Sequence, residues 1–136
     1  MKKLIYTLLI IIALTNNSFS AGSNDDSTPK VSEYTKAKNL IKTAKKYEKK
    51  GNIEKAQKRY AKAQKLLLKS NEKKPLQADT LNYLGFTTRK LGDYEGGEKF
   101  YLLGLQIEPN HNGINEYLGE LYVATNRMDM AKERLE

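Results

Sequence analysis

The sequence predicts an all-α protein built from about three helix–turn–helix repeats. From residue 33 onwards, apolar residues recur at spacings of three and four, which is the pattern of amphipathic helices. The pair Leu84-Gly85 recurs as Leu118-Gly119, and Gly97 is matched by Ala131 at the same offset along the chain. A fixed period of about 34 residues, as here, is typical of stacked helical repeats.

Residues 1–20 have the features of a secretory signal peptide. Lys2-Lys3 forms a basic start, an apolar run extends over residues 4–14, and residues 18–20 place small side chains at a cleavage site. The run is shorter than the about 20 apolar residues that a membrane-spanning helix needs. We therefore expect an exported protein, periplasmic or secreted, with N-terminal anchoring to the inner membrane as the alternative. Residues 21–32 are small and polar and are expected to form a flexible leader.

The first helix pair is expected to turn at Gly51, which can adopt the left-handed conformation that ends a helix. Ser32 and Asn52 are the expected N-caps of its two helices. The interval from Gly51 to Gly92 exceeds the repeat period by about two helical turns. The second helix is therefore expected either to run long or to end in a longer loop, and Pro75 prevents it from continuing into the next pair.

The second helix pair is expected within residues 78–111. It turns at Gly92, and Asp93 is the expected cap of its second helix. Gly97 and Gly104 each cost about 1 kcal/mol of helix propensity relative to Ala. They indicate either a loosely specified helix or close approach of a neighbouring helix. We favour close approach, because both glycines lie on the apolar stripe.

The third pair is expected to begin near Asn112, to turn at Asn126 and to start its last helix at Met128. Repeat arrays usually finish with a helix whose outer face is polar. The sequence stops before the last repeat period is complete. We interpret this end either as a truncation or as a surface through which the chain oligomerises.

These repeats resemble the tetratricopeptide repeat (TPR) family, whose pattern is Trp-x2-Leu-Gly-x2-Tyr, then Ala-x3-Phe, then Pro within a period of about 34 residues. The middle copy resembles that pattern most closely, the last copy resembles it well, and a weaker first copy precedes them. The matching residues of the middle copy are Leu81, Leu84, Gly85, Gly97, Tyr101 and Pro109, and those of the last are Leu118, Gly119, Tyr122, Ala131 and Leu135.

The resemblance implies a TPR-like α-solenoid over residues 33–136. Its repeats would cover about residues 37–74, 78–111 and an incomplete 112–136. Small side chains are needed where two helices of a pair cross, since larger ones would hold the backbones apart. The expected repeat-packing residues are Ala44, Ala56, Leu84, Gly85, Gly97, Pro109, Leu118, Gly119 and Ala131.

In the TPR family, the first helices of the pairs line a concave groove that holds peptides. The resemblance therefore implies a protein- or peptide-binding scaffold of the cell envelope. Asn82 and Arg89 suit a peptide backbone or carboxylate, and Phe86 is expected to offer an apolar platform. The expected groove residues are Lys38, Lys45, Lys49, Asn82, Phe86, Arg89, Lys90, Glu116 and Glu120.

Charge is divided unevenly along the chain. Between Lys30 and Lys74 there are 16 Lys and Arg against four Glu, whereas from Pro75 onwards there are six against ten Asp and Glu. The basic part favours an alternative function, association with an anionic membrane surface or a polyanion. Nucleic acid is disfavoured, because the block has few Arg or aromatic residues to contact bases. The lysines expected close to one helix face are Lys55, Lys58, Lys62, Lys65 and Lys69.

The sequence offers no catalytic constellation. It contains no Cys and a single His, which excludes a disulfide framework and thiolate chemistry. His111 follows Pro109-Asn110 and is expected to be a loop residue. We therefore expect no enzymatic activity, no cofactor and no metal site.

Overall fold

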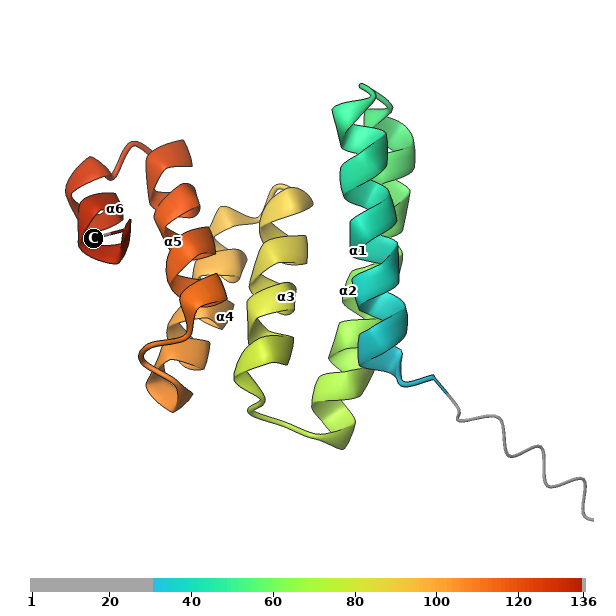
Figure 1. Cartoon of the computed structure of the whole chain (residues 1–136), viewed down its shortest axis with the longest axis horizontal. Helices are drawn as coiled ribbons and strands as arrows, with labels where there is room; N and C mark the ends of the chain where they lie inside the picture. The colour runs from blue at the N-terminus through green and yellow to red at the C-terminus, as the bar shows by residue number, and fades with distance from the viewer. Residues whose placement is uncertain (1–30, 136) are drawn as a thin grey trace, which may run out of the picture.

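The computed structural model describes residues 31–135, which form six α-helices and no strand (Figure 1). The all-α prediction is confirmed. The predicted signal peptide and nearly all of the predicted leader lie outside the described residues. The helices are α1 (Glu33–Lys49), α2 (Ile53–Lys73), α3 (Ala78–Lys90), α4 (Tyr94–Ile107), α5 (Asn112–Ala124) and α6 (Met128–Leu135).

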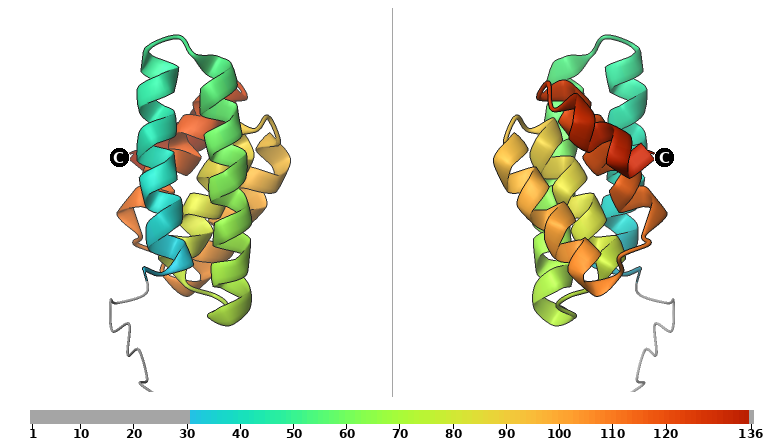
Figure 2. Two further views of the ribbon diagram at one scale, coloured as in Figure 1. Left: turned by 90° about the vertical axis from the view of Figure 1, so that its right-hand side faces the viewer. Right: turned by 90° about the vertical axis from the view of Figure 1, so that its left-hand side faces the viewer.

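The helices pack mainly as consecutive pairs, α1 with α2, α3 with α4, and α5 with α6. Between pairs, α3 packs against α2, and α5 packs against α4 and α3. The views in Figures 1 and 2 place α1, α3 and α5 on one side of the molecule and α2 and α4 on the other. We call the first side the α1–α3–α5 face.

The same backbone turn ends the first helix of every pair. Gly51, Gly92 and Asn126 have positive φ angles of 72°, 98° and 58°. In each case the next amide donates to the carbonyl five residues earlier, at 2.8–3.1 Å. This arrangement is a Schellman motif, which satisfies carbonyl groups that the helix end leaves free. All three predicted turn residues are confirmed.

Side-chain caps begin four of the helices. Ser32, Asn52 and Asp93 each accept a hydrogen bond from the amide three residues later, as predicted. His111 lies in the loop before α5, as predicted, and it also caps that helix, because its Nδ1 accepts from the Ile114 amide at 3.1 Å. The imidazole supplies the acceptor that Ser, Thr, Asp or Asn usually provides at this position.

Helix α2 accounts for the longer interval in the first repeat. It extends over 21 residues, so the expectation of a long helix is confirmed over that of a long loop. Its end at Lys73 is followed by a short connection in which Leu76 has a φ of 58° and is exposed.

Two glycines on first helices let the second helix of their pair approach closely. A Cβ added to Gly85 would lie 2.5 Å from Cε1 of Tyr101, and one added to Gly119 would lie 2.8 Å from Cδ2 of Leu135. Such separations are far below van der Waals contact, so only glycine fits without movement. The two contacts are separated by one repeat period, which makes the packing periodic as well as the sequence.

The glycines of α4 also face neighbouring helices. A Cβ on Gly97 would lie 3.0 Å from the Gly85 carbonyl oxygen, and one on Gly104 would collide with Ile114 of α5. The interpretation of these glycines as sites of close helix approach is confirmed. Their cost in helix propensity is offset by the packing they permit.

All but one of the predicted packing positions are buried. Pro109 is exposed, so its expected packing role is wrong. It follows the end of α4, where it helps to stop the helix because it lacks an amide donor. The other eight are buried, namely Ala44, Ala56, Leu84, Gly85, Gly97, Leu118, Gly119 and Ala131.

Candidate binding site on the α1–α3–α5 face

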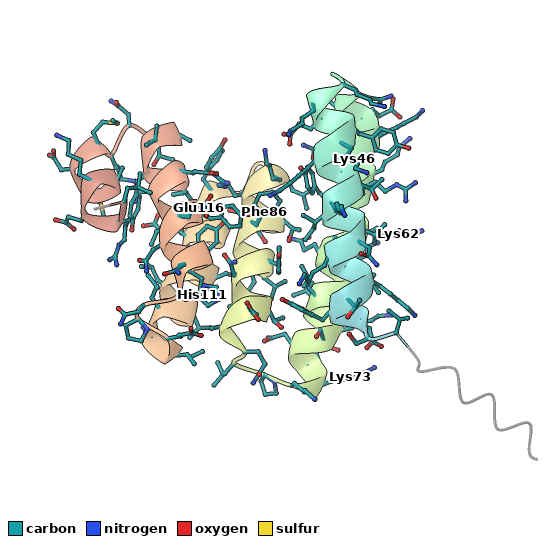
Figure 3. The ribbon with its side chains drawn as sticks, in the orientation of Figure 1. Lys46, Lys62, Lys73, Phe86, His111 and Glu116 are labelled. Atoms are coloured by element: carbon teal, nitrogen blue, oxygen red, sulfur yellow. The ribbon has the colours of Figure 1, made fainter. Side chains whose placement is uncertain are left out.

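All nine predicted groove residues lie on α1, α3 and α5. The structure separates them into side chains that remain free, side chains that pair with one another, and side chains that are buried. Figure 3 labels two of them, Phe86 on α3 and Glu116 on α5.

Phe86 lies at the centre of an aromatic cluster and is only 2% exposed. Its ring centroid is 5.7 Å from that of Tyr60 and 4.9 Å from that of Tyr117. The expectation that Phe86 offers an open apolar platform is therefore wrong. Helix α3 lies between the first and third pairs, so the Phe86 ring is covered by Tyr60 from the first pair and by Tyr117 from the third.

Lys45 connects α1 to α5 across this cluster. Its Nζ donates to the Tyr117 hydroxyl at 3.0 Å and lies 4.6 Å from the centroid of the Phe86 ring. An ammonium over an aromatic face is attracted by the ring quadrupole. The half-buried Lys45 therefore covers Phe86 and holds the first pair to the third.

Two basic side chains of α3 are neutralised within the protein. Arg89 is 9% exposed, and its Nη2 donates to a carboxylate oxygen of Glu120 at 2.7 Å. Lys90 donates to Glu48 at 2.8 Å. The expectation that Arg89 is free to bind a ligand carboxylate is therefore wrong, because Glu120 of the next pair already occupies its guanidinium group.

Glu48 is an anion held by two donors. Burial raises the pKa of Glu48, but hydrogen bonds from Lys90 and the Tyr60 hydroxyl outweigh it and leave the pKa below its ordinary value. Burial and the hydrogen bond to Glu48 raise the pKa of Tyr60. The α1–α3 contact at this end is therefore an internal network of compensated charge.

Asn82 is also buried. Asn82 is 6% exposed, and its Nδ2 fills the space that a Cβ on Gly113 of α5 would occupy. Nearby, Nε2 of His111 is 3.2 Å from Oδ1 of Asp79. These contacts fix the start of α5 against α3, so Asn82 has a packing role rather than the predicted contact with a peptide.

A hollow of about 290 Å³ remains open between α1 and α3. Lys38 lies near two tyrosine rings, with Nζ 6.0 Å from the centroid of Tyr83, which lines the hollow, and 5.4 Å from that of the neighbouring Tyr34. Burial raises the pKa of Tyr34 to about 12. We call this site the α1–α3 hollow, and its lining is Lys38, Asn39, Ile41, Lys42, Lys45 and Tyr83.

The lysines of the α1–α3 hollow have no acidic partner in the part of the chain that the structure describes. Within residues 31–135, Lys38, Lys42 and Lys45 form no salt bridge. Lys49, further along α1, is also exposed and free of such pairs, as is Glu116 on α5. Among the predicted groove residues, the charge outside these salt bridges is thus positive at Lys38, Lys45 and Lys49 and negative at Glu116.

Several residues of the site are absent from the predicted groove set, namely Asn39, Ile41, Lys42, Tyr83 and Tyr117. Tyr83 and Tyr117 follow the predicted positions Asn82 and Glu116 by one residue, and the two tyrosines are separated by one repeat period. That recurrence is a signal that could have identified them. Their contribution depends on how far each helix is rotated, because a small rotation brings the adjacent position onto the face.

Within residues 31–135, no group of His, Asp and Glu side chains is arranged to hold a metal ion. In the same part of the chain, no helix combines the length and the apolar character required to cross a bilayer.

No protein-family model matches the sequence, and no curated protein matches it. The resemblance to the TPR family therefore rests on the repeats of this chain.

Proposed function

We propose that this chain is a TPR-like α-solenoid that acts as a non-enzymatic, peptide-binding scaffold of the cell envelope. Three features support the proposal. The turns at Gly92 and Asn126 share one geometry at the repeat interval, the contacts of Gly85 and Gly119 repeat at the same interval, and the first helices share one face (Figure 1). The signal-like residues 1–20 support export.

The observation that carries the binding proposal is the α1–α3 hollow. Three lysines without an acidic partner in residues 31–135 surround a recess that also has an apolar and aromatic wall. Charge-assisted hydrogen bonds between ammonium and carboxylate groups are stronger than neutral ones. The ligand that fits best is an acidic peptide segment with Asp or Glu side chains, or a free carboxylate, next to an apolar residue.

The charge layout also orients the peptide. The acidic part would lie over Lys38 and Lys42 on α1, and a basic residue would lie towards Glu116 on α5. Arg89 and Phe86 would not touch this peptide, because Glu120 and the aromatic cluster cover them.

The test is selection from a displayed random-peptide library on the immobilised chain, followed by fluorescence anisotropy with the selected peptides. We expect enrichment of peptides rich in Asp and Glu. Lys38→Gln/Lys42→Gln should weaken their binding by at least about tenfold, since each removed charge-assisted hydrogen bond is worth about 1.5–3 kcal/mol. The matched control is Lys36→Gln/Lys50→Gln, which removes equal charge from exposed positions elsewhere on and beside α1.

The proposal fails if the selection enriches no acidic sequence. It also fails if the two double variants weaken binding equally, because net charge and not the α1–α3 hollow would then explain the affinity.

A further inference from the structure

Helix α2 carries a straight row of cations on its outer side. The row is spaced by three, four, three and four residues, which keeps it within about 80° of arc at about 100° per residue. It lies opposite the buried stripe that runs from Ala56 to Leu67. We call this row the α2 lysine stripe, and its members, all exposed, are Lys55, Lys58, Lys62, Lys65 and Lys69.

Packing and helix stability do not account for this row. Like charges four residues apart destabilise a helix. Within residues 31–135, Lys58 has an acidic partner, Glu54 at 2.6 Å, and Lys55 lies 5.7 Å from the Tyr47 ring centroid. The remaining three lysines have neither an acidic nor an aromatic partner in that part of the chain.

The end of the molecule that α1 and α2 form allows a flat surface to approach the stripe. At a rise of about 1.5 Å per residue, the stripe is about 21 Å long with a cation about every 5 Å. Figure 2 shows α1 and α2 side by side across one whole end of the molecule, and in Figure 3 Lys62 points outward from that end. An open hollow of about 510 Å³, lined by Lys58, Arg59, Ala61, Lys62 and Lys65, leaves room for head groups between the side chains.

We propose that the α2 lysine stripe docks the protein on the surface of an anionic lipid bilayer. Rows of lysine near a membrane are attracted by its negative surface potential. Protein interfaces are centred instead on Trp, Tyr or Arg anchors, whereas the hollow beside this stripe is lined mainly by lysine. The stripe is charged along its whole length, so the contact is electrostatic. Docking through α2 leaves the α1–α3–α5 face open, so the surface is separate from the proposed peptide site.

The experiment is co-sedimentation of the full chain with phosphatidylcholine vesicles in which one lipid in four, or none, is phosphatidylglycerol. We expect binding to the anionic vesicles that falls steeply between about 50 and about 300 mM salt, because the Debye length shortens. Lys62→Gln/Lys65→Gln/Lys69→Gln should reduce the partition coefficient on the order of 100-fold, which corresponds to about fivefold for each lysine near the surface.

The control lowers the net charge equally at exposed sites on α4, α5 and α6, in the triple variant Lys99→Gln/Asn112→Asp/Lys132→Gln. It should lower the partition coefficient by about threefold or less, since charges further than a Debye length from the bilayer are largely screened. Both variants replace exposed residues, and circular dichroism establishes that each keeps its helices. Because segments outside the substituted helices are identical in the two variants, any contribution from residues 1–20 cancels.

Three outcomes would overturn the proposal. Equal losses in the two triple variants would mean that net charge alone drives adsorption. Equal binding to vesicles with and without phosphatidylglycerol would mean that charge is not used. Stripe-dependent binding to soluble polyphosphate without binding to anionic vesicles would identify the stripe as a site for a linear polyanion.

Discussion

At the scale of single residues, the spacing within the second pair depends on one missing side chain. Gly85 lies directly beneath the ring of Tyr101, which is fully buried. Tyr101 cannot move aside easily, because interiors are packed like crystals and have few voids. The contact between these two residues therefore sets the distance between α3 and α4.

Gly85→Ala should destabilise the fold by about 1–3 kcal/mol through overpacking, even though Ala is the better helix former. Chemical denaturation monitored by circular dichroism measures the change. The double variant Gly85→Ala/Tyr101→Leu should be less destabilised than the sum of its single variants, because the smaller side chain relieves the clash. Additive effects would show that Gly85 and Tyr101 do not oppose each other.

At the scale of elements, one ion pair joins α4 to the third pair. Arg127, just after the third turn, donates from Nη1 and Nη2 to the two carboxylate oxygens of Glu98 at 2.9 and 2.7 Å. Its guanidinium carbon lies 4.5 Å from the Tyr122 ring centroid. The hydrogen bond from Arg127 lowers the pKa of Glu98, while partial burial opposes it. The pair therefore favours the folded state whenever Glu98 is ionised.

Glu98→Gln should lower the free energy of unfolding at pH 7 by about 1–2 kcal/mol. Because the folded-state pKa of Glu98 is lowered, its contribution is present above the unfolded pKa of about 4.3 and is lost as pH falls through the folded value. The difference in unfolding free energy between wild type and Glu98→Gln, measured by urea unfolding, should therefore be smaller at pH 3 than at pH 7. Glu95→Gln is the matched control, since Glu95 pairs with Lys99 on the same helix but is 82% exposed, and such pairs contribute little. If that difference were the same at pH 3 as at pH 7, the ionised form of Glu98 would not be the source of the stabilisation.

At the scale of the whole molecule, burial is distributed unevenly among the helices. Helix α3 is buried along most of its length because other pairs flank it on both sides. Helix α6 has eight residues, and Ala131 is its one buried residue. Met128, Met130 and Leu135 of α6 are 40–57% exposed. Few buried apolar contacts and exposed backbone hydrogen bonds are the features of a locally unstable segment.

Hydrogen–deuterium exchange followed by mass spectrometry should therefore rank the helices by position in the stack. We expect α6 to exchange fastest and α3 slowest, with a difference of at least about tenfold in protection. Short isolated helices are marginal in water, and tertiary packing supplies most of their stability. Protection of α6 equal to that of α3 would mean that an additional contact, such as a second copy of the chain, covers the last pair.

The sequence by itself determined the helices, their turns and their close crossings. Gly51, Gly92 and Asn126 mark the turns, because a left-handed backbone position is a local requirement that few residues meet. Gly85 and Gly97 mark a crossing, because small side chains at a fixed period recur where backbones approach. Each of these properties depends on residues within one helix pair, where spacing along the chain translates directly into position on a helix.

The tertiary structure alone decided which side chains of the α1–α3–α5 face remain available. Phe86 is covered by Tyr117, and Arg89 is neutralised by Glu120, both contributed by the next pair. Spacing within a helix cannot reveal such contacts, since they depend on the rotation and distance between pairs. A small rotation determines whether a long side chain reaches solvent or a neighbour. The placement of the pairs also leaves the lysines of the α1–α3 hollow available, because no carboxylate of residues 31–135 lies close enough to form a salt bridge with them.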